Sequence, residues 1–238
     1  MNEHVPFGRR MNEIVHNPKQ FVIEHALVKY SVLSFVLLCV VELLAYFAFW
    51  RTLEFLSAYG WWIFYVNVAV VSVCAGLWHL KSYHAQVSCM VGMMIGMTLG
   101  MQTGMMVGTI IGFTNGLFVG GIVGMLLAVV VGVYAGSCCG IMGVMEGMMA
   151  GIMGGVMGSM IGTMFRVDHI LWFMPVFMVL NVSVMGGLSY MIVEELCLQG
   201  AKKKEIGFWS YLCYCLVFAA LLVLVMVYGP KTGLAKIG

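Results

Sequence analysis

The chain is organised as a series of long apolar runs separated by short polar segments. A helix that crosses a bilayer needs about 20 mostly apolar residues, and seven runs approach or exceed that length. This pattern predicts an all-α, polytopic transmembrane helix bundle of about seven spans. The expected spans are Tyr30–Trp50, Tyr59–Leu80, Ala85–Ile111, Leu117–Tyr134, Cys139–Phe165, Ile170–Ile192 and Phe208–Tyr228.

The polar start of the chain differs in character from everything that follows. We expect residues 1–29 to form a cytoplasmic tail or an interfacial helix, and residues 30–238 to form the transmembrane domain. Lys and Arg are more frequent on the side of the predicted spans that carries the N-terminus. This bias predicts a protein of the cell or inner membrane with a cytoplasmic N-terminus and an outside C-terminus.

Composition agrees with this picture and excludes other classes. Hydrophobic residues make up 62% of the chain and charged residues 9%, against about 25% charged residues in soluble domains. The net charge of +2 and the scattered basic residues exclude a nucleic-acid groove. No nucleophile elbow, phosphate loop or zinc-protease motif is found, so we do not expect an enzyme.

The middle third of the chain, residues 85–165, carries glycine at almost every fourth position. Lipid gives helices no hydrophobic reason to associate, so small residues that allow close backbone contact supply the packing instead. A four-residue repeat also drifts around a helix in the sense opposite to a heptad, which favours right-handed crossings. We therefore expect glycine-zipper (GxxxG-repeat) packing of spans three to five, through Gly92, Gly96, Gly100, Gly104, Gly108, Gly147, Gly151 and Gly155.

Spans three and five also look like two copies of one segment. Residues 92–108 and 143–159 align so that Gly92 matches Gly143 and Met94 matches Met145. Two spans apart, the copies have the same direction across the membrane. The pattern predicts a parallel internal repeat.

Most of the 23 methionines lie on these same two spans, and some recur at every fourth position. Thioethers are soft ligands that favour Cu(I), and stacked sites of weak ligands let an ion enter and leave. The alternative is that methionine is a flexible apolar filler beside glycine grooves. The two candidate metal ladders are Met93, Met97, Met101 and Met105, and Met145, Met149, Met153 and Met157.

Methionines spaced by three residues on one span, together with GxxxG packing, resemble the features of Ctr-type copper transporters. The resemblance implies Cu(I) as the bound ion. It covers only spans three and five. Those transporters are small three-span trimers with a Met-rich extracellular tail, whereas this chain is longer and lacks such a tail.

Cysteine and histidine residues near the span ends are further metal candidates. His84 and Cys89 lie at the junction of spans two and three, where they could form an entry or exit site for a soft metal. The vicinal pair Cys138 and Cys139 stands at the start of span five, where a metal could be handed over. None of the eight cysteines forms a CxxC pattern, which argues against a disulfide framework.

Two carboxyl groups are expected at membrane depth, Glu42 in span one and Glu146 in span five. Buried carboxyls are costly when charged and are rare unless they face a cavity or a partner. We regard both as candidates for gating or proton coupling. The alternative for Glu146 is an interhelical hydrogen bond made as a neutral acid.

These observations favour a membrane transporter or binding protein for a soft metal ion, most plausibly Cu(I). The alternative is a glycine-zipper oligomeric ion channel, or a structural or accessory subunit of a membrane complex, with no metal role. A lipid-facing accessory protein without transport is a third possibility. The expected partners are the lipid bilayer, a second copy of the chain or other membrane subunits, and no nucleic acid.

Overall fold

A computed structural model describes residues 22–49, 53–82, 88–166, 169–199 and 207–231 of the chain. All regular structure in these ranges is helical, and seven helices are long and apolar enough to cross a membrane. The predicted seven-helix membrane fold is therefore confirmed, and the chain is an integral membrane protein. The helices are α2 (Val22–Phe49), α3 (Leu53–Ser82), α4 (Cys89–Asn115), α5 (Leu117–Gly136), the short 3-10 helix η1 (Ser137–Cys139), α6 (Ile141–Met164), α7 (Ile170–Gln199) and α8 (Phe208–Tyr228).

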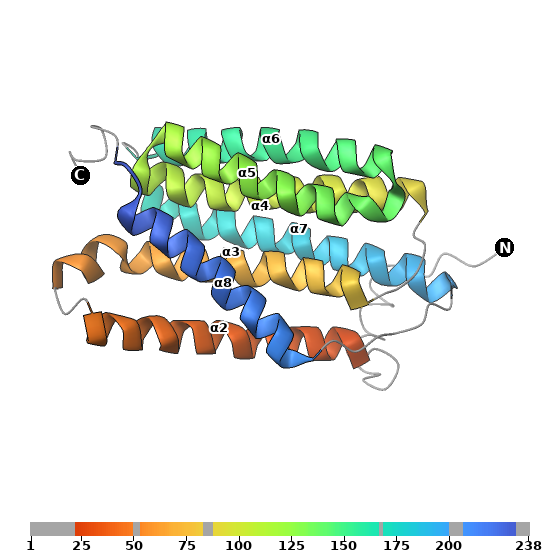
Figure 1. Cartoon of the computed structure of the whole chain (residues 1–238), viewed down its shortest axis with the longest axis horizontal. Coiled ribbons are helices and arrows are strands. Elements are labelled where there is room, and N and C mark those ends of the chain that lie inside the picture. Colours follow the sequence, from red (N-terminus) through yellow and green to blue (C-terminus); the bar gives the residue numbers. More distant parts are fainter. Residues whose placement is uncertain (1–21, 50–52, 83–87, 167–168, 200–206, 232–238) are drawn as a thin grey trace.

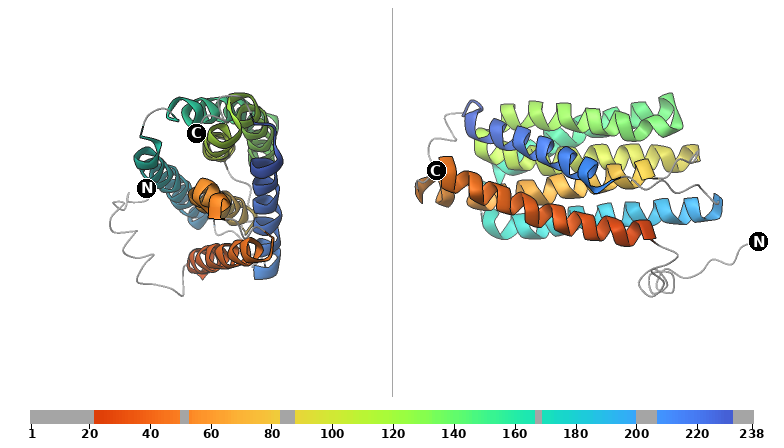
Figure 2. Two further views of the ribbon diagram at one scale, coloured as in Figure 1. Left: turned by 90° about the vertical axis from the view of Figure 1, so that its left-hand side faces the viewer. Right: turned by 60° about the horizontal axis from the view of Figure 1, so that its bottom comes forward.

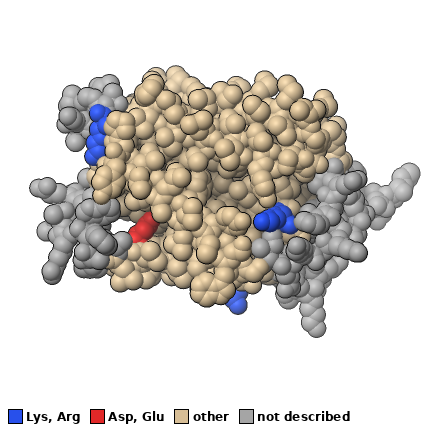
Figure 3. All heavy atoms as spheres, viewed as in Figure 1, with Lys and Arg blue, Asp and Glu red and all other residues tan. Residues whose placement is uncertain are grey.

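Successive helices run in opposite directions, and α8 crosses the others obliquely (Figure 1). We call the end at which α4 and α6 begin, on the right in Figure 1, the cysteine end. α2 also begins there, and α8 finishes at the opposite end. The face shown in Figure 3 carries few charged side chains, as a surface in contact with lipid requires.

The helix boundaries differ from the predicted spans without changing their number, and α6, at Ile141–Met164, is shorter than the predicted Cys139–Phe165. α2 begins at Val22, so residues 22–29 of the predicted tail belong to the first helix. The rest of that tail, residues 1–21, lies outside the described residues. α7 likewise continues to Gln199, past the predicted Ile192. Apolar runs mark the part of a helix that fits the membrane, and the helices themselves continue beyond it.

Glycine in the left-handed region ends two helices of this bundle. Gly116 (φ 108°) separates α4 from α5, and Gly140 (φ 75°) precedes α6. Side chains other than glycine rarely adopt such φ values. The first break lies between the predicted spans Ala85–Ile111 and Leu117–Tyr134.

α4, α5 and α6 pack much more closely with one another than any other helices do, and we call them the glycine bundle (Figure 2). Their backbones touch at glycine positions. A Cβ atom added at Gly96 would lie 2.9 Å from the Cα of Gly136, and one at Gly108 would lie 2.7 Å from the carbonyl oxygen of Gly155. Both values are shorter than real Cβ contacts allow, so this helix spacing requires glycine.

α4 also has a second, bulky face, which joins the glycine bundle to the remaining helices. Ile95 and Leu99 are fully buried there, and Leu99 lies against Gly76 of α3. Trp62 of α3 stacks on Phe113 of α4, with ring centroids 3.9 Å apart. The large side chains of α3, α7 and α8 therefore pack on one side of α4, and the small residues of α5 and α6 pack on the other.

Candidate functional site

The structure brings together two cysteines from different candidate positions in the sequence. Cys89 is the first residue of α4, and Cys139 is the last residue of η1, immediately before α6. The Sγ atoms of Cys139 and Cys89 are 2.6 Å apart. The Cys139 thiol also lies 2.9 Å from the carbonyl oxygen of Cys89. Two thiols thus meet at the cysteine end of the glycine bundle.

Cys138 lies beside this pair, and Gly92 makes the room. A Cβ atom added at Gly92 would be 2.5 Å from the Cβ of Cys139 and 3.4 Å from the sulfur of both Cys138 and Cys139. Both sulfurs are therefore within contact distance of one point on α4. We call Cys89, Cys138 and Cys139 the cysteine cluster. In this arrangement the Cys138 thiol donates to the carbonyl oxygen of Ala135 at 3.2 Å.

The cysteine cluster is accessible and lies at two helix N-termini. Cys89 and Cys138 are exposed, and Cys139 is partly buried. Neither Ser88 before α4 nor Gly140 before α6 provides a side-chain cap for the first backbone N–H groups. Uncapped N–H groups carry partial positive charge, which stabilises the negative charge that thiolate ligands bring to a metal.

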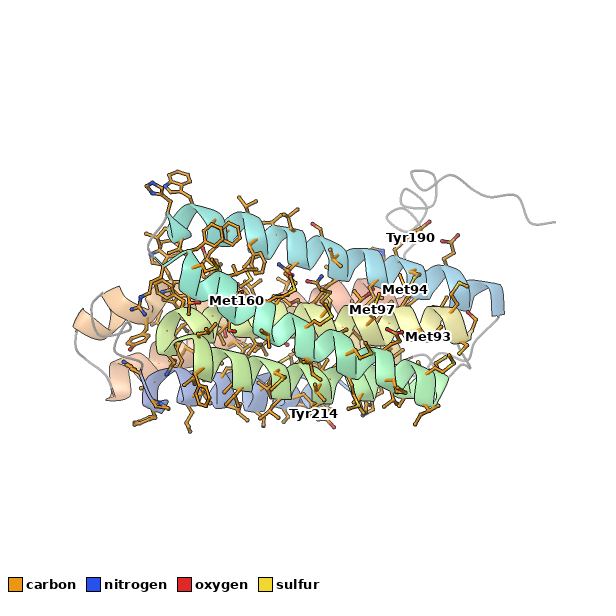
Figure 4. The ribbon with its side chains drawn as sticks, turned by 90° about the horizontal axis from the view of Figure 1, so that it is seen from above. Met93, Met94, Met97, Met160, Tyr190 and Tyr214 are labelled. Carbon is orange, nitrogen blue, oxygen red and sulfur yellow. The ribbon has the colours of Figure 1, made fainter. Side chains whose placement is uncertain are left out.

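The methionine ladder of α4 starts one helical turn after Cys89 and runs along α6. A Cβ atom at Gly154 of α6 would lie 2.5 Å from the carbonyl oxygen of Met101, and one at Gly158 would lie 2.6 Å from that of Met105. Met101 and Met105 are partly buried. Figure 4 shows the earlier members Met93 and Met97 on α4 in the half of the bundle nearer the cysteine end.

The methionine ladder of α6 has a different environment. Met145, Met149, Met153 and Met157 are 44–58% exposed, and they lie on the outer face of the helix. The physical reason is the glycine repeat itself. Glycines occupy the face of α6 that packs on α4 and α5, and residues two positions later are turned by about 200° from them. Glycine backbone contacts therefore fill the interface, and the two ladders do not face each other across it.

Glu146 belongs to the same seam between α4 and α6. The two helices are parallel, with Gly154 opposite Met101 and Gly158 opposite Met105. Counting about eight residues back along each helix from the contact of Gly154 with Met101 places Glu146 at the same level as Met93. Its side chain is partly buried and forms no hydrogen bond or ion pair within the described part of the chain.

Glu42, the other candidate carboxyl group, lies in a separate region. Asn67 of α3 donates its side-chain N–H to Glu42 Oε2 of α2 at 2.6 Å. α2 packs against α3 and α8. Glu42 therefore takes part in a polar contact between α2 and α3, away from the cysteine cluster.

His84 lies outside the described residues. His79 is buried, and its Nδ1 is 2.8 Å from the hydroxyl oxygen of Ser189. Among the described residues, no three or more side chains of His, Cys, Asp and Glu are grouped so as to hold a metal ion. The cysteine end instead offers a thiol pair with thioethers nearby.

The close approach of Cys89 and Cys139 was not recognised from the sequence, although a signal for it was present. The internal repeat aligns Gly92 with Gly143 in two parallel helices. Cys89 precedes the first of these glycines by about one turn, and Cys139 precedes the second by about one turn. The alignment therefore places Cys89 and Cys139 at the same height along the two parallel helices.

Comparison with protein-family models, with curated proteins and with solved structures found no match to this chain.

Proposed function

We propose that this protein binds Cu(I) at the cysteine cluster and conducts it into the membrane along the methionine ladder of α4. The thiol pair of Cys89 and Cys139 is the observation that carries the proposal. Thiolate and thioether sulfur are the donors that select Cu(I) among the metals available to a cell. The pair supplies the first of these, and the α4 ladder supplies the second.

The donor set also discriminates against other common metals. Structural zinc sites almost always have four ligands from cysteine, histidine or carboxylate groups. Calcium and magnesium require several oxygen ligands. A thiol pair followed by thioethers meets neither need, whereas a soft monovalent ion can be held by sulfur alone.

The path beyond the cluster consists of weak sites at regular intervals. Met93 follows Cys89 by one turn, a rise of about 6 Å, and Met97, Met101 and Met105 continue at the same interval. Conduction needs sites that bind well enough to accept an ion and weakly enough to release it. Glu146, level with Met93, is the proposed coupling group, because its carboxylate can balance the charge of an arriving cation.

The glycine repeat has a supporting role in this proposal. We assign the contacts of α4, α5 and α6 to a glycine zipper with right-handed crossings. Such packing holds Gly92 against Cys139 and keeps the sulfur atoms of the cluster together. The cysteine end would face the cytoplasm, where thiols stay reduced and able to bind metal.

A metal-free oligomeric role is the second candidate. The observation that favours it is the outward-facing ladder of α6, which a second copy or another membrane subunit could cover. In that case the exposed methionines serve as flexible packing groups. The protein would then act as an ion channel or a structural subunit, and the cysteine cluster would not contribute to that function.

A Cu(I) titration of the purified, reduced protein against a coloured Cu(I) chelator tests the proposal. Cys89→Ser and Cys139→Ser should weaken Cu(I) binding by more than about tenfold. Cys213→Ser is the matched control, since Cys213 is an exposed free cysteine on α8. Its affinity should equal that of the unaltered protein. Equal affinities in all four proteins would overturn the proposal, and subunit number measured by native mass would then examine the oligomeric alternative.

A further inference from the structure

A second candidate site lies where the glycine bundle meets the outer helices. A partly open cavity of about 330 Å³ lies between α3, α5 and α8, a volume near the lower limit of small-molecule pockets, which is about 300 Å³. α5 packs mainly against α4 and α6, while α3 and α8 pack against each other. The cavity therefore occupies the seam at which the two groups of helices separate.

The lining changes from apolar to polar along the helix axis. Val73 and Phe218 line the part nearer the middle of the bundle, and Lys81, Tyr134 and Tyr214 line the part nearer the cysteine end. From Val73 to Lys81 the cavity wall extends about 12 Å along α3. Lys81 Nζ lies 5.6 Å from the centroid of the Tyr214 ring, which Figure 4 labels on α8. The cavity thus has an apolar depth and a cationic rim.

Trp78 adds a buried donor to the same wall. Its side chain lines the cavity and is 7% exposed. Within the described residues, the indole N–H of Trp78 has no hydrogen-bond acceptor. The Trp78 ring is held edge-on to Tyr211, with centroids 6.1 Å apart. Buried donors are nearly always paired, so an oxygen-bearing ligand in this cavity would supply a missing partner.

We propose that this cavity binds a fatty acid, with its carboxylate at Lys81 and its hydrocarbon chain in the apolar depth. Charge complementarity selects the anionic head group, and the apolar lining accommodates the hydrocarbon chain. The site is separate from the cysteine cluster, and its occupancy does not depend on metal binding.

Photolabelling of the full-length protein in nanodiscs tests this assignment. Two probes are compared, a fatty acid with a diazirine on its chain and the matching fatty alcohol with the same diazirine. The acid should label the α3 and α8 segments that line the cavity, and an excess of unlabelled fatty acid should suppress this labelling. Labelling by the alcohol should be weaker by roughly fivefold, because it lacks the charge that pairs with Lys81.

Lysine variants identify the group responsible. Lys81→Gln should abolish the preference for the acid, and Lys81→Arg should retain it. Lys231→Gln is the matched control, because Lys231 also lies over a tyrosine ring, 4.9 Å from the centroid of Tyr59, but belongs to the opposite end of α8. Lys81 is exposed, so its replacement should leave the fold intact. Equal labelling by acid and alcohol, or equal effects of Lys81→Gln and Lys231→Gln, would overturn the proposal and indicate that bilayer chains fill the seam without selection.

Discussion

The sulfur atoms of Cys89 and Cys139 lie 2.6 Å apart, although 50 residues separate the two cysteines in the chain. The contact depends on the parallel start of α4 and α6 at one end of the glycine bundle. It also depends on Gly92, against which the Cys139 side chain packs. The thiol pair is therefore a product of glycine packing, and changes to that packing should alter its chemistry.

Mild oxidation should link the two thiols within one chain. Diamide should take two electrons and two protons from Cys89 and Cys139 and leave a disulfide between them, since their sulfurs are already in contact. Peptide mass spectrometry after alkylation should find the linked pair. Cys213, exposed on α8, should remain free to alkylate. Bound Cu(I) should slow the linkage. Separate alkylation of Cys89 and Cys139 after diamide treatment would show that the thiols do not meet.

Adding one methyl group at Gly92 should weaken metal binding without removing a ligand. The new Cβ atom would lie 2.5 Å from the Cβ of Cys139, so the two groups must move apart. We expect Gly92→Ala to lower Cu(I) affinity by about tenfold in the chelator titration, an effect typical of a displaced metal ligand. Gly187→Ala should have no effect, because nothing lies within 4 Å of its added Cβ. An unchanged Cu(I) affinity in Gly92→Ala would show that metal binding does not depend on the glycine packing.

Glycine positions inside and outside the glycine bundle should respond in opposite ways to alanine. At Gly108 the added Cβ would lie 2.7 Å from the carbonyl oxygen of Gly155, so Gly108→Ala should lower the free energy of unfolding by about 1–3 kcal/mol. Gly187→Ala should leave it unchanged or raise it by up to about 1 kcal/mol, since alanine favours helix. Reversible unfolding in mixed detergent measures both values. Equal effects of the two substitutions would argue against close packing at Gly108.

The fold could be predicted from the sequence far more fully than the site could. Apolar runs gave the number and approximate positions of the seven spans because membrane helices must satisfy their backbone groups internally. The break at Gly116 lies between two of these runs, Ala85–Ile111 and Leu117–Tyr134. The number of spans and the positions of the breaks depend on local sequence, so both could be predicted without knowing how the helices pack.

The arrangement of side chains around the site depends on how the helices are rotated and placed. From the sequence we expected the methionine ladders of α4 and α6 to have the same role. The α6 ladder instead faces outward, because the glycines of α6 occupy the inner face of that helix. The meeting of Cys89 with Cys139 required the relative level of two helices, which periodicity within one helix does not give. The contact between Glu42 and Asn67 likewise joins two helices.

The two methionine ladders should differ in their effect on copper movement. Met97→Leu with Met101→Leu should slow Cu(I) uptake into vesicles that contain the protein, because leucine keeps the volume and removes the sulfur. Met149→Leu with Met153→Leu should leave uptake nearly unchanged, since these side chains are 58% and 55% exposed on the outer face. Uptake lost only in the α6 pair would instead place the path between copies of the chain.

X-ray absorption at the copper edge tests the central claim most directly. The protein is loaded with one equivalent of Cu(I) under reducing conditions, and the atoms bound to copper are identified from the fine structure. The account predicts a first shell made only of sulfur, which loses a sulfur neighbour in Cys139→Ser and is unchanged in Cys213→Ser. A shell of nitrogen or oxygen, or the same spectrum in the Cys89→Ser, Cys139→Ser double variant, would contradict it.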